Sequence, residues 1–188
     1  IETPIGIVRL WLSENEKPEN FSVPFFMAID DTRKLSPDWV SVEIDGENVI
    51  ALEADWDGNT DIWLYYPDIQ EREQLTDTDF SEQSPAWSPD GTQLAYMTWE
   101  SDRAEIAIHD FTSGESRTIT SFEGFASAPQ WSPDGNYLVF SGNAIFEDEE
   151  DLDLYIMDSN GDNVRKITDF DGNEGFPDWR PCPTTVSQ

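Results

Sequence analysis

The pentapeptide W-S-P-D-G occurs twice in this chain of 188 residues, at Trp87–Gly91 and again at Trp131–Gly135. Two further tryptophans stand in related contexts, S-P-D-W at Trp39 and F-P-D-W at Trp179. Each of the four tryptophans follows a proline by two positions, and they are separated by 48, 44 and 48 residues. A recurring period of this length indicates repeated structural units that stack on one another.

A second series of similar segments runs between the tryptophans. Three blocks of 15 residues align without a gap, and each opens with an apolar run and closes with an aliphatic residue and threonine. They begin at Ile62, Ile106 and Leu154 and end at Thr76, Thr120 and Thr168. From each of these threonines to the next tryptophan is eleven positions. The N-terminal segment Val8–Ser22 fits the same block loosely.

Each unit contains four short apolar stretches separated by turn-forming residues. In the unit that starts near Trp87 they are P-A-W, L-A-Y-M-T-W, E-I-A-I-H-D-F and R-T-I-T. Such stretches, rich in aromatic and β-branched residues, indicate β-strands, and no window shows the apolar spacing of an amphipathic helix. Four antiparallel strands every 44 to 48 residues are typical of a β-propeller blade, so we expect an all-β propeller of four-stranded antiparallel blades.

The repeated S-P-D-G predicts the turn between the first and second strands of a unit. Proline sets φ for the first corner of a type I turn, aspartate tolerates the second corner, and glycine takes the left-handed position that follows. The tryptophan before the turn is then free to fill the space between neighbouring blades, where a large flat ring buries much apolar area. We therefore expect equivalent surroundings for Trp39, Trp87, Trp131 and Trp179.

W-S-P-D-G followed by an apolar strand, then D-G-N-T-D-I-W at Asp57–Trp63 and a closing L-T, resembles the TolB-type β-propeller repeat. That family includes periplasmic TolB proteins, propeller domains of prolyl-oligopeptidase-like peptidases, and secreted bacterial and archaeal proteins. The resemblance extends over about Leu35 to Pro181 and implies the fold more specifically than the function. The first unit departs from the pattern with W-V-S-V-E-I-D-G, and the third carries an acidic insertion, F-E-D-E-E-D-L-D.

Within one propeller domain the expected complete blades are residues 39–86, 87–130 and 131–178. Residues 1–38 offer a third and a fourth strand with a connecting loop, and residues 179–188 offer a first strand and a tail, so the two ends together make a partial blade. Three arrangements stay open: the C-terminal part of a larger, six-bladed propeller, a compact four-bladed ring, or a ring or blade edge completed by another chain. An open edge exposes unpaired N–H and C=O groups and invites strand addition.

The charge of the chain excludes two classes of partner. Asp and Glu number 40 against 10 Lys and Arg, which gives a net charge of −30. Such a surface repels nucleic acid and anionic membranes, so we expect neither as a partner. Self-repulsion also strains the compact state, and high ionic strength or bound divalent cations relieve that strain. The acidity is typical of salty or calcium-rich surroundings, or simply of a very soluble secreted protein.

One loop is a candidate calcium site. D-W-D-G-N-T-D places four oxygen-bearing side chains at alternate positions around a glycine, as hard cations require, although it lacks the glycine register and terminal glutamate of an EF-hand. The candidate ligands are Asp55, Asp57, Asn59 and Asp61. Similar loops are Asp158–Asn163 and Asp169–Glu174, and Glu147–Asp151 is an acidic run. D-G-N is also ordinary hairpin chemistry, so the alternative is a turn without an ion. No other cofactor is expected.

The sequence offers no recognisable catalytic residues, and we expect no enzymatic activity. A G-x-S-x-G nucleophile motif is absent, and the only histidine, His109, stands inside an expected strand beside Asp110. One histidine and one cysteine, Cys182, are too few for a zinc site, and Cys182 has no partner for a disulfide within the chain. Trp56 and Trp99 lie outside the repeated tryptophans and either fill space between blades or form a binding surface.

A propeller presents its loops on two faces around a channel, and the fold alone does not define a function. These features favour a non-catalytic interaction or structural module in an extracellular or periplasmic location. It would bind a protein partner, or assemble with itself, through its loop faces or an open blade edge. The alternative is the regulatory propeller domain of a prolyl-oligopeptidase-like serine peptidase, whose hydrolase domain would follow Gln188. A propeller lyase or glycosidase is disfavoured by the near absence of histidine.

Overall fold

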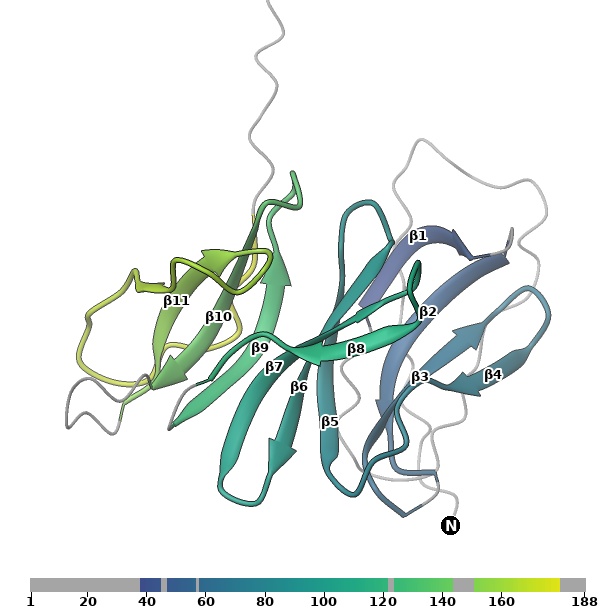
Figure 1. Cartoon of the computed structure of the whole chain (residues 1–188), viewed down its shortest axis with the longest axis horizontal. Helices are drawn as coiled ribbons and strands as arrows, with labels where there is room; N and C mark the ends of the chain where they lie inside the picture. The colour runs from purple at the N-terminus through teal and green to yellow at the C-terminus, as the bar shows by residue number, and fades with distance from the viewer. Residues whose placement is uncertain (1–37, 45–46, 57, 122–123, 144–150, 180–188) are drawn as a thin grey trace, which may run out of the picture. The chain divides into compact units, whose positions relative to one another are not determined.

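The fold is seen in a computed structural model of the chain, in which residues 38–44, 47–56, 58–121, 124–143 and 151–179 are described, with side chains from Asn48 onward (Figure 1). Every regular element within these ranges is a β-strand, which confirms the all-β class. In the same ranges no helix has the length and hydrophobicity needed to cross a membrane. Residues 1–37, which contain most of the expected partial blade, lie outside the described residues, so that blade stays a prediction.

The first sheet contains four antiparallel strands in chain order (Figure 1). They are β1 (Asp38–Ile44), β2 (Glu47–Ala54), β3 (Asp61–Tyr66) and β4 (Glu71–Gln74). The segment W-V-S-V-E-I, which departs from the repeated pentapeptide, belongs to β1 itself. Because no S-P-D-G turn follows Trp39, this strand continues for five residues beyond the tryptophan.

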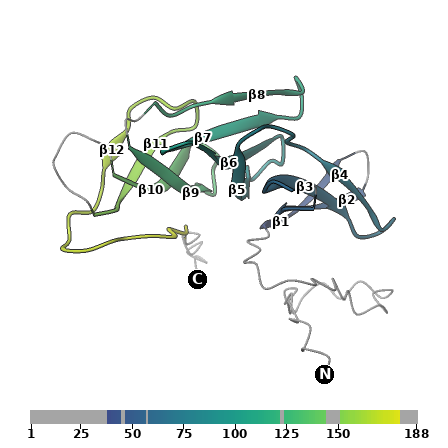
Figure 2. The same cartoon turned by 90° about the horizontal axis from the view of Figure 1, so that it is seen from below.

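The second and third sheets repeat the same order. The second consists of β5 (Ser81–Trp87), β6 (Gln93–Glu100), β7 (Arg103–Asp110) and β8 (Glu115–Thr118), and the third of β9 (Phe125–Trp131), β10 (Tyr137–Asn143), β11 (Asp153–Asp158) and β12 (Arg165–Lys166). Pairing within each sheet is antiparallel. A single parallel register pair, Ala104 with Phe125, links β7 to β9 and joins the two sheets into one hydrogen-bonded set (Figure 2).

Both S-P-D-G segments form the predicted turn. The Gly91 N–H donates to the Ser88 carbonyl at 2.8 Å, the Gly135 N–H donates to the Ser132 carbonyl at 2.9 Å, and both glycines have a left-handed φ, 68° and 71°. The serine hydroxyl also donates to the aspartate two residues later, at 2.7 Å in the first turn and 2.6 Å in the second. This bond is the main reason that the pKa of Asp90 lies below its ordinary value. The serine, aspartate and glycine of the repeated turn therefore each have a structural role.

In the second and third sheets the first strand ends on its tryptophan and contains a bulge. In β5 the register against β6 shifts between Gln83 and Ala86, and Ser84 has a left-handed φ of 54°. An extra residue of this kind bends a strand and increases its twist. The strand begins at Ser81, six residues before Trp87. Its first residues are small or polar and show no apolar pattern.

The same conformation recurs three residues before the next two tryptophans. Ala128, which precedes Trp131, has φ 49°, and Phe176, which precedes Trp179, has φ 55°. A bulky residue adopts a left-handed φ only where its surroundings impose it. Phe176 thus repeats the backbone conformation found three residues before the other two tryptophans, in keeping with the fourth repeat that begins there in the sequence.

An apolar cluster fills each gap between consecutive sheets. The cluster between the first and second sheets consists of Val49, Ala51, Ile62, Leu64, Trp87, Leu94, Tyr96 and Ala107. The cluster between the second and third sheets consists of Ala86, Ala95, Ile106, Ile108, Ala126, Trp131, Leu138, Phe140, Tyr155 and Met157. The middle strands of the second sheet are thus buried on both faces, which explains their nearly continuous apolar sequence.

Two indole N–H groups donate hydrogen bonds to the preceding repeat. The Trp131 Nε1–H donates to the Ala86 carbonyl at 3.0 Å, and the Trp179 Nε1–H donates to the Gln130 carbonyl at 3.2 Å. Ala86 directly precedes Trp87, and Gln130 directly precedes Trp131, so the two bonds are equivalent. Trp87 itself is buried in the first cluster. The side chain of Trp39 lies outside the described residues, so its equivalence stays a prediction.

Candidate functional site

The threonine that ends each 15-residue block forms a hydrogen bond with the third strand of its sheet. The threonine Oγ1 accepts a hydrogen bond from the first amide of its block at 2.8 Å in all three sheets: Thr76 from Ile62, Thr120 from Ile106, and Thr168 from Leu154. The hydroxyl in turn donates to a carboxylate, that of Asp61, Glu105 or Glu174 respectively. A buried amide needs such an acceptor. This role was missed from the sequence, although the constant 15-residue spacing signalled it.

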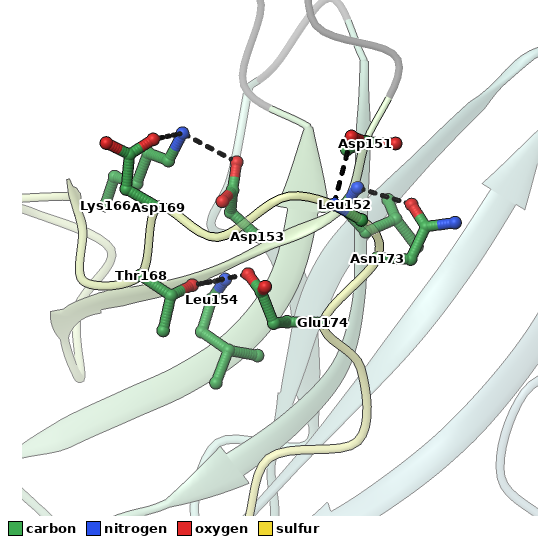
Figure 3. A network of polar contacts seen from close by, with 10 residues as sticks. Asp151, Leu152, Asp153, Leu154, Lys166, Thr168, Asp169, Asn173 and Glu174 are labelled. Atoms are coloured by element: carbon green, nitrogen blue, oxygen red, sulfur yellow. Dashed lines mark hydrogen bonds and ion pairs between the residues drawn. The ribbon is translucent and has the colours of Figure 1, made fainter.

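In the third sheet the threonine lies within a larger polar network (Figure 3). Lys166 Nζ lies 2.8 Å from Asp153 Oδ2 and 3.2 Å from Asp169 Oδ1. The loop that follows is fastened to the start of β11, because Asn173 Oδ1 accepts the Leu152 N–H at 2.7 Å. Three of the oxygen-bearing side chains of D-F-D-G-N-E, an expected cation loop, thus bind groups of the chain itself: Asp169, Asn173 and Glu174.

The segment that carries this network also contains exposed apolar side chains, which we call the C-terminal patch. It consists of Val164, Ile167, Phe170 and Phe176, with exposed fractions of 37%, 44%, 72% and 85%. Ile167 also lines an open depression together with Lys166, Thr168 and Asp169. Several exposed aromatic and aliphatic side chains within one short segment of a highly charged chain are typical of an interaction surface.

The repeat shows what the C-terminal patch corresponds to. Ile167 directly precedes the closing threonine, as Leu75 and Ile119 do in the first and second sheets. Leu75 packs against the cluster shared with the second sheet, and Ile119 packs against the cluster shared with the third. In the two preceding repeats, the residue at this position packs against the following sheet. Ile167 holds the same position in the third repeat, and among the described residues it is exposed.

The candidate calcium loop is only partly described. Asp57 lies outside the described residues, and Asp61 is buried at the start of β3. Asn59 Nδ2 donates to the carbonyls of Thr78 and Phe80, so this side chain fastens the connection between the first and second sheets. In the ranges that the structure describes, no group of three or more His, Cys, Asp or Glu side chains is arranged to hold a metal ion. Calcium binding by Asp55–Asp61 stays a prediction.

His109 has the contacts of a structural strand residue. Its Nδ1 lies 2.9 Å from Ser116 Oγ, its ring meets the Phe111 ring at a centroid distance of 4.6 Å, and burial lowers its pKa. Asp110 accepts the amides of Thr112 and Ser113 and so shapes the turn after β7. Cys182 lies outside the described residues.

The two additional tryptophans are exposed on different sheets. The Trp56 ring meets Trp63 edge-on at 5.0 Å and lies 4.2 Å from the Arg72 guanidinium, a cation–π contact. Trp99 meets the ring of Phe125 edge-on at 5.2 Å. Each is therefore held in part by an aromatic neighbour, and the remainder of each ring faces solvent.

Comparison with known proteins identifies the repeat. The model of a family described as the TolB beta propeller domain matches residues 59–187. A Tol-Pal system protein TolB from Nitrosococcus oceani is 49% identical over 45 residues, which are 24% of this chain and 10% of that protein. The chain thus matches about a tenth of the length of this curated relative.

Solved structures show the same architecture. A TolB-type protein from Agrobacterium tumefaciens superposes with a TM-score of 0.61 and 24% identity, over 71% of this chain and 46% of that one. A puromycin-hydrolysing peptidase from Mycobacterium tuberculosis gives a TM-score of 0.55 and 15% identity, over 71% of this chain and 20% of the peptidase. At these identities the likeness shows the propeller fold alone.

Proposed function

Because the chain belongs to the TolB beta propeller domain family, we propose that it is a non-catalytic interaction module that binds a protein partner outside the cytoplasm, in the periplasm or at the cell exterior. Its matched relatives carry the name Tol-Pal system protein. The net charge of −30 disfavours nucleic acid and anionic lipid and favours a protein surface of complementary positive charge.

The observation that supports this proposal best is the exposure of the C-terminal patch. Ile167 occupies a position that contacts the next sheet in the two preceding repeats, and Phe170 and Phe176, further along the same segment, are the most exposed of the large apolar side chains described. Covering such side chains removes apolar surface from water, which is the main favourable term in protein association. The partner is a different protein. If the chain instead assembles with itself, the partner is a second copy of this chain.

The experiment replaces the two most exposed members of the patch, in a double Phe170→Ser and Phe176→Ser variant. The control is Ile69→Ser, an exposed apolar residue after β3. Immobilised wild type should retain a protein from the extracytoplasmic fraction of native cells, and the purified partner should bind the double variant at least tenfold more weakly, about 1.4 kcal/mol. Sedimentation velocity detects self-assembly. Equal retention by wild type and double variant, with both monomeric, would contradict the proposal.

A second candidate function is the regulatory propeller domain of a serine peptidase, supported by the fold likeness to the puromycin-hydrolysing peptidase. It requires an α/β-hydrolase domain in the same polypeptide. The intact mass of the protein isolated from native cells and its activity on a chromogenic peptide separate the two candidates. A mass near 21.4 kDa without hydrolysis contradicts the peptidase candidate. A larger mass with serine-dependent hydrolysis supports it.

A further inference from the structure

Two exposed aromatic side chains lie at the same end of the second sheet, where β5 begins and β6 ends (Figure 1). Phe80 directly precedes β5, and Trp99 is paired in register with Ser81, the residue after Phe80. Their exposed fractions are 36% and 40%. The S-P-D-G turn lies at the opposite end of these two strands, and neither ring belongs to the C-terminal patch. The two rings therefore mark a separate surface.

Both residues are held in place although their rings are exposed. The Phe80 N–H donates to Thr78 Oγ1 at 3.0 Å. The Trp99 indole N–H donates to the Ser101 carbonyl at 3.2 Å, and its ring meets the Phe125 ring edge-on at a centroid distance of 5.2 Å. A side chain that is already fixed loses little conformational entropy when a partner covers it. Trp99 in particular is preorganised for contact with a partner.

Exposed acids flank the two rings along the chain. Two precede Phe80, and two follow Trp99 before β7 begins: Asp77, Asp79, Glu100 and Asp102. In the described part of the chain none of these four carboxylates forms a hydrogen bond or an ion pair. At the opposite end of the sheet, Asp90 and Asp110 instead accept the amides of their own turns. The four acids are thus available to a partner, and together with Phe80 and Trp99 we call them the acidic–aromatic patch.

The first sheet shows which group an exposed indole of this chain can hold. Trp56, in the connection between β2 and β3, has the guanidinium of Arg72 at 4.2 Å from its ring centroid. In the aligned block of the second sheet, the position of Arg72 is taken by Ser116. Trp99 is the exposed indole beside the corresponding connection between β6 and β7, and among the described residues no cation lies over its ring. The negative face of an indole attracts a guanidinium, so the open ring of Trp99 fits a cation from another molecule.

We propose that the acidic–aromatic patch binds an arginine-bearing segment of a partner protein, with a guanidinium over Trp99 and carboxylates of the patch beside it. Arginine fits better than lysine, because its planar guanidinium stacks on a ring and pairs with a carboxylate through its N–H groups. The acids of the patch also attract a basic segment and repel an acidic one. This site is separate from the C-terminal patch and does not depend on the function proposed for that patch.

The test measures binding of a fluorescein-labelled peptide in which arginine alternates with glycine and serine, by fluorescence anisotropy with the full chain at physiological ionic strength. The same peptide with citrulline, an uncharged analogue, at each arginine should bind more weakly. Trp99→Ala keeps the charge of the chain and should weaken binding of the arginine peptide about fivefold, which corresponds to about 1 kcal/mol. The matched control, Tyr137→Ala, removes an exposed ring after the S-P-D-G turn of the third sheet and should leave the affinity unchanged. Equal affinities of Trp99→Ala and wild type would overturn the proposal, as would equal binding of the two peptides.

Two double variants separate this site from the general attraction of an acidic surface. Asp79→Asn with Asp102→Asn neutralises two acids of the patch. Glu71→Gln with Glu115→Gln neutralises two exposed acids of the outer strands β4 and β8. The first pair should weaken binding by a larger factor than the second, and equal losses would overturn the site. Displacement of the peptide by cellohexaose, a neutral oligosaccharide, would also overturn it, because the rings would then form a sugar site.

Indole resonances of the wild type provide a direct measurement if a variant does not fold. In ¹⁵N-tryptophan-labelled protein, the Trp99 indole signal should shift on addition of the arginine peptide, and the signal of the buried Trp131 should not. A Trp99 signal that stays in place would overturn the site. The double Phe170→Ser and Phe176→Ser variant should bind the peptide as tightly as wild type. Loss of binding in that variant would assign the peptide to the C-terminal patch, which overturns this site without contradicting the proposed function.

Discussion

Replacing Trp131 with phenylalanine should weaken the contact between the second and third sheets. The indole is 8% exposed within the cluster of those sheets and donates to the Ala86 carbonyl at 3.0 Å. Loss of the donor leaves a buried carbonyl without its partner, about 1–3 kcal/mol. The smaller ring removes packing worth about 1–2 kcal/mol. The sum, about 2–5 kcal/mol, is a large part of the about 5–15 kcal/mol that stabilises a typical domain.

The assay is urea unfolding followed by far-UV circular dichroism at pH 6 in 1 M NaCl, with Trp99→Phe as the matched control. Trp99 is 40% exposed, and its indole donates to the Ser101 carbonyl only two residues away. The control should lose less than about 0.5 kcal/mol, as is usual for surface changes. A Trp131→Phe loss below about 0.5 kcal/mol, or an equal loss in the control, would refute the role of the indole.

Four further substitutions, in two matched pairs, test other contacts by the same unfolding assay. Thr120→Val removes the acceptor of a buried β7 amide and should cost about 1–3 kcal/mol, whereas Thr168→Val, which is half-buried, should cost less. Equal losses would contradict the account. Gly161→Ala should cost about 2 kcal/mol or more, because φ is +94° and a Cβ would clash with the Ile119 carbonyl, whereas Gly172→Ala, at φ +103° in open space, should cost about 1 kcal/mol. A reversed order would contradict the close approach.

The sequence predicted the strand class, the S-P-D-G turns and the family because these depend on local chemistry that repeats along the chain. Proline, aspartate and glycine have backbone preferences that act within four residues, so Trp87–Gly91 and Trp131–Gly135 could be interpreted without coordinates. The start of β5 was harder to predict. Its first residues form a bulge around Ser84 and lack the apolar alternation by which strands are recognised.

Side-chain contacts could not be predicted, whether within a repeat or between repeats, because spacing in sequence does not give the partner of a side chain. The constant position of Thr120 was evident, but not that its hydroxyl accepts the Ile106 amide. Trp99 lies outside the repeated tryptophans, and only the pairing of β7 with β9 brings its ring to Phe125. The exposure of Ile167 likewise depends on how the sheets pack and cannot be predicted from the 15-residue block that contains it.

The central claim is that Trp131 and Trp179 each donate a hydrogen bond from the indole to the repeat before them. Hydrogen exchange of the indole N–H groups in ¹⁵N-tryptophan-labelled protein tests this most directly, with assignments taken from the phenylalanine variants. The Trp131 indole should be among the slowest of the eight to exchange, at least about 100-fold slower than Trp99, with Trp179 between them. A Trp131 indole that exchanges as fast as Trp99 would contradict the claim.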